Sequence, residues 1–119
     1  MAKFARSVAI VDDDPSVLKA LARLVRTRSF VAKTYQSGPQ FLASLSGGLP
    51  QYLVVDLQMP EMTGLDLLLD LTRRRIEIPT IIITAHDEVN MRERCKIAGA
   101  IAYLLKPVQD KALFAAMEG

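Results

Sequence analysis

A chain of 119 residues has room for one compact domain, so we expect residues 1–119 to form a single domain. Half of the residues are hydrophobic and 24% are charged, which is typical of a folded globular protein and excludes a disordered or fibrous chain. The net charge is only +2 and the basic residues are spread out, so direct nucleic-acid binding is not expected, and the lone Cys95 excludes an internal disulfide.

The apolar runs of the chain are all short. None approaches the ~18 residues that suggest a membrane span. The run before Asp12 follows basic residues, but it is too short for the core of a signal peptide. We therefore expect a cytoplasmic protein that makes no contact with a membrane.

Short β-branched runs alternate with segments of helical periodicity, which is the pattern of βαβ units that build a parallel sheet. The sequence predicts strands over residues 7–11, 30–35, 52–55, 80–84 and 102–105. It predicts helices over residues 15–28, 41–45, 65–71, 89–98 and 110–117. We expect Asp14 to cap the first helix, Gly99 to close the fourth and Asp110 to cap the last, which is short.

Polar residues stand where the predicted strands end. In an open parallel sheet, ligands bind beyond the carboxyl ends of the strands, so the side chains at these ends should converge on one mouth. They are Asp12, Asp13 and Asp14 after the first strand, Asp56 after the third, Thr84 closing the fourth, and Lys106 after the fifth.

Several carboxylates at one mouth require a cation, because two like charges ~4 Å apart repel by about 4 kcal/mol at an effective dielectric near 20. Lys106 supplies one fixed positive charge. Oxygen ligands without cysteine or histidine favour a hard divalent ion, with Mg²⁺ first. Such a cluster suits a phosphoryl group, and aspartate is an established nucleophile that forms an aspartyl-phosphate.

Four short motifs occur in order along the chain: Val-Asp-Asp-Asp-Pro at 11–15, Val-Asp-Leu-Gln-Met-Pro at 55–60 with Gly64 after it, Thr84-Ala85, and Lys106-Pro107. In this order and spacing they resemble the receiver domain of two-component response regulators, and most of all receivers attached to a helix-turn-helix transcription output. The resemblance implies a flavodoxin-like, doubly wound sheet of five parallel strands in the order 2-1-3-4-5, with helices on both faces. We expect the chain to be excised from a longer regulator.

The resemblance also implies the roles of the site residues. Asp56 is implied to be the phosphoacceptor, while Thr84 and Lys106 each contact a phosphoryl oxygen. Asp12 is implied to act on the metal largely through bound water. The implied ligands of Mg²⁺, or of Mn²⁺, are Asp12, Asp13, Asp56 and the main-chain carbonyl of Gln58.

A switch is implied as well. Tyr103 matches the family's aromatic residue that turns inward as Thr84 moves toward the phosphoryl group. The side chains of Gln58 and His86 lie at positions that can tune the lifetime of the phosphoryl group. A cis peptide is implied before Pro107.

The implied partners are a sensor histidine kinase, which donates the phosphoryl group, and a DNA-binding output domain in the parent protein. Homodimerisation on phosphorylation is a further expectation. A receiver of this kind is a signalling switch and not an enzyme with a separate substrate, because it catalyses only its own phosphorylation and slow autodephosphorylation.

Simpler interpretations stand beside these roles. Asp14 before Pro15 is better explained as a helix cap than as a ligand. Without the resemblance, Tyr103 is equally well explained as a half-buried packing residue, and His86 as polar surface.

Two rival functions are a phosphatase of the haloacid dehalogenase kind and a degenerate module that is never phosphorylated. In such a phosphatase the nucleophile follows the first strand and the acidic pair comes late. Here the acidic run comes first and Asp56 lies mid-chain. The complete set of site residues argues against the degenerate module.

Overall fold

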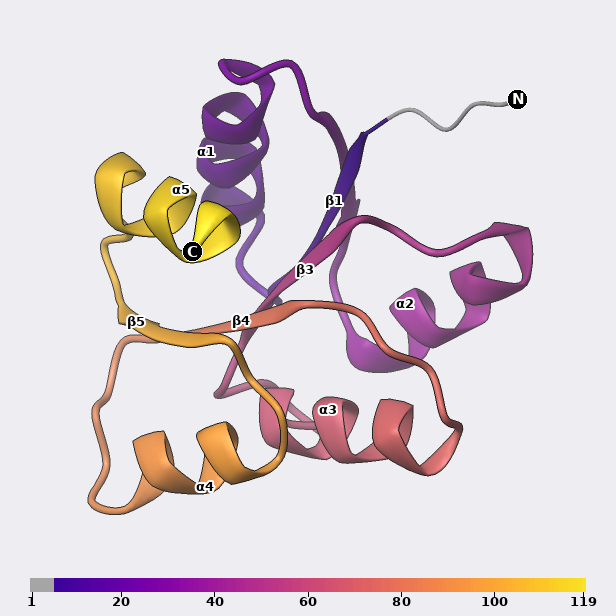
Figure 1. Cartoon of the computed structure of the whole chain (residues 1–119), viewed down its shortest axis with the longest axis vertical. Coiled ribbons are helices and arrows are strands. Elements are labelled where there is room, and N and C mark those ends of the chain that lie inside the picture. The colour runs from indigo at the N-terminus through magenta and orange to yellow at the C-terminus, as the bar shows by residue number, and fades with distance from the viewer. Residues whose placement is uncertain (1–5) are drawn as a thin grey trace.

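The computed structural model of the protein describes residues 6–119, and their strands form one parallel sheet (Figure 1). The strand order is β2-β1-β3-β4-β5, which confirms the predicted doubly wound, flavodoxin-like topology. The strands are β1 (Ser7–Val11), β2 (Val31–Tyr35), β3 (Tyr52–Asp56), β4 (Thr80–Thr84) and β5 (Ala102–Leu105).

Helices cover both faces of the sheet. In Figure 1, α1 and α5 lie on one side of the strands, and α2, α3 and α4 lie on the other. None of the described helices is long and apolar enough to cross a membrane. The helices are α1 (Pro15–Arg26), α2 (Gly38–Ser44), α3 (Gly64–Arg73), α4 (Met91–Ile97) and α5 (Asp110–Glu118), with a short 3₁₀ turn, η1 (Leu45–Gly47), after α2.

The alternation of side chains along each strand divides the interior into two cores. Val54, Ile81 and Ile83 pack with residues of α1 and α5, whereas Val55 and Ile82 pack with residues of α2, α3 and α4. The central strands are therefore apolar on both faces, as expected for a sheet covered by helices on both sides. Rigid packing on both faces fixes the positions of the strand ends, where the polar residues lie.

The start of α1 agrees with the prediction and its end does not. The Asp14 side chain accepts a hydrogen bond from the Ser16 N–H at 2.9 Å, so Asp14 is the helix cap. The helix ends at Arg26, two residues before the predicted end. The chain turns through Ser29, whose φ of 68° lies in the left-handed region.

Two other helix starts correct the prediction. The helix expected from residue 89 begins at Met91, because Asn90 has a left-handed φ of 68° that no α-helix contains. Val89 is consequently 88% exposed. The cap of α5 is Gln109, without a side-chain hydrogen bond, and Asp110 is the first helical residue.

Candidate functional site

Three carboxylates meet at the carboxyl ends of two neighbouring strands. Asp12 and Asp13 follow β1, and Asp56 is the last residue of β3. The two strands pair in parallel with Val11 opposite Val55, so Asp12 and Asp56 stand side by side. One carboxylate oxygen from each of Asp12, Asp13 and Asp56 lies within 4.8 Å of the others.

Burial divides these acids into two kinds. Asp12 is fully buried and Asp56 is 4% exposed, whereas Asp13 faces solvent. The N–H of Asp14 donates a hydrogen bond to Asp12 Oδ1 at 2.9 Å, which fixes the Asp12 carboxylate. The cluster therefore has a rigid inner part and one acid at its open side.

Lys106 brings a positive charge to the inner part of the cluster. Its Nζ lies 2.8 Å from Asp12 Oδ2 and 3.3 Å from Asp56 Oδ1. Burial lowers the pKa of the Lys106 ammonium. The hydrogen bond to Asp12 and the negative charges of Asp56 and Asp12 raise this pKa by more than burial lowers it, so the net shift is upward. Lys106 therefore stays charged at neutral pH. The peptide bond between Lys106 and Pro107 is cis, as the resemblance implied.

The environment of Asp56 makes its ionised form costly. Burial, followed by the neighbouring charge of Asp12, raises the pKa of Asp56 from 3.8 to about 6. Lys106 and a hydrogen bond from the main chain of Gln58 oppose this shift without cancelling it. The carboxylate is thus ionised at neutral pH but incompletely compensated, which is typical of a functional group.

The donor set fits a hard divalent cation. Asp12 Oδ2 and Asp56 Oδ1 are buried, and the only cation that pairs with them within residues 6–119 is Lys106. Each oxygen therefore keeps a lone pair for a further positive partner. Carboxylate oxygens with an open, solvent-facing side match Mg²⁺, which retains several waters in protein sites.

Gly64 lets the backbone of α3 pass close behind the phosphoacceptor candidate. A Cβ atom placed on Gly64 would lie 2.6 Å from the main-chain oxygen of Asp56. The N–H of Gly64 also donates a hydrogen bond to the oxygen of Leu57 at 3.1 Å. Only glycine fits here, because the atoms that a Cβ would meet belong to the main chain of Asp56 and Leu57 and cannot rotate away.

We expect Gly64→Ala to lower the free energy of unfolding by about 1–3 kcal/mol, because overpacking forces backbone shifts. The shift should also displace Asp56 and weaken metal binding. Gly47→Ala is the matched control, since nothing lies within 4 Å of a Cβ there. Urea unfolding followed by circular dichroism, with Mg²⁺ titration, tests this. Equal stabilities of the two variants would contradict it.

Thr84 stands at the end of β4, beside the cluster. It is fully buried, and its main-chain oxygen accepts a hydrogen bond from the Lys106 N–H at 2.8 Å. Its hydroxyl lies 2.7 Å from Gln58 Oε1 and 2.9 Å from the His86 oxygen. The structure therefore brings Thr84 to the site but directs its hydroxyl toward two neighbouring loops.

The family model for the response regulator receiver domain matches residues 8–118. The chain belongs to this family. A receiver domain is the phosphoacceptor component of two-component signalling, which is the general role of this chain.

Two curated relatives of the receiver are named as regulators of this kind. The receiver is 39% identical over 112 residues to the transcriptional regulatory protein FixJ of Rhizobium meliloti, and this alignment covers 94% of the receiver and 55% of FixJ. It is 36% identical over 110 residues to the response regulator protein TmoT of Ectopseudomonas mendocina, covering 92% of this chain and 50% of TmoT. The receiver thus spans about half the length of these relatives.

Solved structures give the same answer. The crystal structure of FixJ-N has a TM-score of 0.86 and 38% identity, and the alignment covers 99% of the receiver and 93% of that chain. A receiver domain protein described as CheY-like, from Methanospirillum hungatei, has a TM-score of 0.87 at 23% identity, with 97% and 92% covered. The second likeness supports the fold alone.

Tyr103, the expected aromatic switch of the receiver, lies on β5 and is buried. It is 6% exposed, and its hydroxyl has no hydrogen-bond partner within residues 6–119. The Arg92 guanidinium carbon lies 4.7 Å from the centre of the Tyr103 ring. Arg92 also donates a hydrogen bond to the main-chain oxygen of Tyr103 at 3.2 Å. The ring therefore already occupies an inward position, fixed from α4.

Neither a role for Arg92 nor the contact of the Gln58 carboxamide with Thr84 was predicted from the sequence. No motif marks Arg92, since an arginine on a short helix is usually solvated surface. Gln58 was expected to contribute its main-chain carbonyl, and its side chain only as an influence on lifetime. His86 contacts the site through its main chain, while its side chain is exposed.

Proposed function

We propose that Asp56 accepts a phosphoryl group from a sensor histidine kinase, with a divalent ion, Mg²⁺ or Mn²⁺, bound beside it. The observation that carries the proposal is the pairing of Lys106 with two buried carboxylates, one of which is raised in pKa to about 6. The proposed metal ligands are Asp12, largely through water, Asp13, Asp56 and the main-chain carbonyl of Gln58. When bound, the ion neutralises charge on the phosphoryl oxygens and orients them.

The protein's own contribution is mainly position and charge. An Asp56 carboxylate oxygen attacks the phosphorus in line, and the bond from phosphorus to the donor nitrogen breaks with its electron pair leaving on the imidazole. A small acyl phosphate serves as donor in the same way, with an oxygen as the leaving atom. Lys106 offsets charge on one phosphoryl oxygen, and Thr84 donates a hydrogen bond to another.

The same residues account for the reset. Water attacks the phosphorus of the aspartyl-phosphate, which releases inorganic phosphate and restores the Asp56 carboxylate. We propose that the side chains of Gln58 and His86 tune how readily this water reaches the phosphorus. The receiver thus catalyses its own phosphorylation and its own slow dephosphorylation, and acts on no separate substrate.

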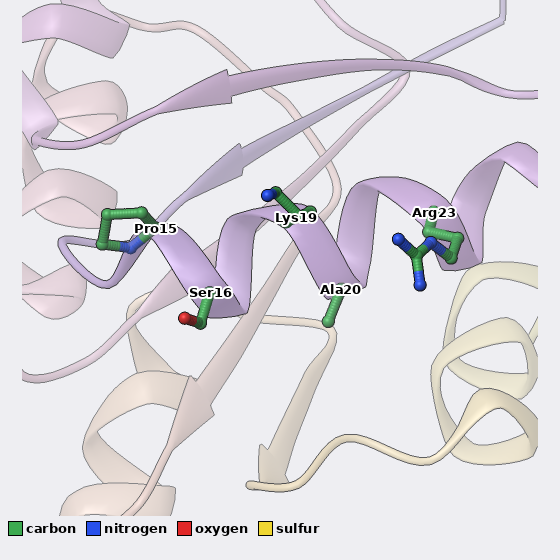
Figure 2. Close-up of a pocket in the computed structure, with 5 residues that line it drawn as sticks. All are labelled: Pro15, Ser16, Lys19, Ala20 and Arg23. Atoms are coloured by element: carbon green, nitrogen blue, oxygen red, sulfur yellow. The ribbon is translucent and has the colours of Figure 1, made fainter.

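The exposed face of α1 supports a protein as phosphoryl donor. This helix begins directly after the acidic cluster, and a shallow hollow of about 290 Å³ lies along it. Figure 2 shows its lining, with Pro15 and Ser16 at the start of the helix and Lys19, Ala20 and Arg23 further along. We therefore propose this surface, which starts directly after the acidic cluster and carries two cations, as the contact for the partner kinase.

We propose that phosphorylation of Asp56 controls a second domain of the parent protein. The proposal includes a DNA-binding output domain in the parent protein, supported by relatives that are named transcriptional regulators and of whose length the alignment covers only 55% and 21%. It also includes homodimerisation on phosphorylation, a switch at Thr84 and Tyr103 in which the Thr84 hydroxyl changes partner, and action in the cytoplasm. Direct nucleic-acid binding by the receiver is not proposed.

The experiment is phosphorylation of the purified chain by acetyl phosphate or phosphoramidate in Mg²⁺, followed by intact mass measurement. We expect one added phosphoryl group on the wild type and none on Asp56→Asn. Chelation of the metal should prevent the addition, because charge on the phosphoryl oxygens is then uncompensated.

Asp110→Asn is the control, since it makes the same change at an exposed carboxylate on α5. It should accept the group as the wild type does. An undiminished adduct on Asp56→Asn would sink the proposal. Steady turnover of a phosphate ester without a stable adduct would favour a phosphatase instead.

A further inference from the structure

The Gln58 side chain spans two loops at the mouth of the sheet. Its Oε1 lies 2.7 Å from the Thr84 hydroxyl, and its Nε2 donates a hydrogen bond to the His86 oxygen at 3.3 Å. The His86 N–H in turn donates to Thr84 Oγ1 at 3.1 Å. Gln58, Thr84 and His86 therefore form a closed set of hydrogen bonds beside Asp56.

This set occupies the Thr84 hydroxyl. A hydroxyl carries one proton, so it donates to Gln58 or to the His86 oxygen, and to one of them at a time. A phosphoryl oxygen on Asp56 would compete for that same proton. Binding it requires Thr84 to leave an acceptor that it holds in this structure.

The aromatic residue of the switch has no comparable move to make. Tyr103 is already buried, and Arg92 fixes it through its ring and its main-chain oxygen. The group that must change partner is therefore the Thr84 hydroxyl. Whatever holds that hydroxyl sets how readily the phosphorylated state forms.

We propose that the Gln58 carboxamide is a latch, which holds the Thr84 hydroxyl away from Asp56 until a phosphoryl group displaces it. This inference rests on the proposed function of Asp56 and adds a positioning residue to it. Release of one neutral hydrogen bond corresponds to about a twofold to tenfold change in an equilibrium constant. The His86 oxygen remains as a second acceptor at 2.9 Å, so the change should lie toward the low end of this range.

The test is the affinity for beryllofluoride, a phosphoryl mimic that binds a carboxylate reversibly and transfers no phosphoryl group. The affinity is measured in Mg²⁺ by NMR titration of the amide resonances of the intact chain. Gln58→Met keeps the main-chain carbonyl and similar length but removes the side-chain acceptor. We expect it to bind beryllofluoride about twofold to tenfold more tightly than the wild type. Gln51→Met, at an exposed glutamine, should match the wild type.

A double-mutant cycle separates a latch from a general effect of shape. In a Thr84→Val background the hydroxyl is gone, so Gln58→Met should no longer change the affinity. An unchanged or weakened affinity for Gln58→Met, or the same gain in the Thr84→Val background, overturns the latch alone. A wild type that binds no beryllofluoride and forms no aspartyl-phosphate overturns the proposed function, and the latch with it.

Discussion

Lys106→Met should destabilise the protein by about 3 kcal/mol in metal-free buffer at pH 7.5, the low end of the cost of breaking a buried ion pair. The variant would leave the carboxylates of Asp12 and Asp56, which are 0% and 4% exposed, without their cation. No other cationic side chain in residues 6–119 pairs with either acid. The low end applies because the Lys106 side chain is 19% exposed, so water reaches the site.

Two changes of condition should restore the stability of Lys106→Met. Mg²⁺ replaces the missing positive charge, and acidification to pH 5 protonates Asp56, whose pKa of about 6 rises further without the lysine. Urea unfolding followed by far-ultraviolet circular dichroism measures this, since the chain has no tryptophan. Lys111→Met is the control at an exposed lysine of α5. A loss that is the same at both pH values and with metal would contradict the argument.

The order of elements could be predicted because its determinants are local. Most strands are short β-branched runs and the helices are amphipathic segments, and parallel connection of such units leaves few topologies. The ends of strands were also predictable, which is why the acidic residues after β1, Asp56 and Lys106 could be expected at one mouth. Their convergence follows from the sheet and needs no knowledge of side-chain directions.

Helix ends were predicted less well, and the physical reason is the backbone at single residues. Val89 fits the apolar periodicity of the fourth helix, but Asn90 adopts a left-handed conformation before it starts. Asparagine tolerates this conformation better than most residues do, yet nothing in the sequence requires it here.

Side-chain contacts between different elements and loops could not be predicted at all. The Gln58 carboxamide reaches Thr84 and His86, residues 26 and 28 positions away, and Arg92 covers a tyrosine 11 positions on. Such contacts depend on rotamers and on the distance between loops, which periodicity does not encode. Gly64 could be predicted in part. A glycine soon after Asp56 indicates that two segments of the backbone lie close together, but the sequence does not say which atoms a side chain would meet.

Asp56→Asn should make the metal-free protein more stable than the wild type at pH 7.5, by up to about 3 kcal/mol. A carboxyl group raised in pKa from 3.8 to about 6 on folding corresponds to a cost of this size for burying its charge. The amide removes that charge at similar volume. Lys106 keeps its partner Asp12 at 2.8 Å in the variant, so no new unpaired cation arises.

The sign of the pH dependence follows from proton binding. Folded wild type holds the Asp56 proton up to a pH of about 6, whereas the unfolded chain releases it near 3.8, so wild-type stability falls relative to the variant as pH rises through this window. The advantage of Asp56→Asn should therefore be full above pH 7 and vanish below pH ~4. Urea unfolding in chelator across this range measures it, and Glu77→Gln controls for losing an exposed negative charge. An advantage that grows as pH falls would contradict the burial of an ionised Asp56. A carboxylate such as Asp56, which lowers the free energy of unfolding at neutral pH, does not serve the stability of the fold. Such a cost is expected of a residue whose role is to react with a phosphoryl donor and to bind a metal.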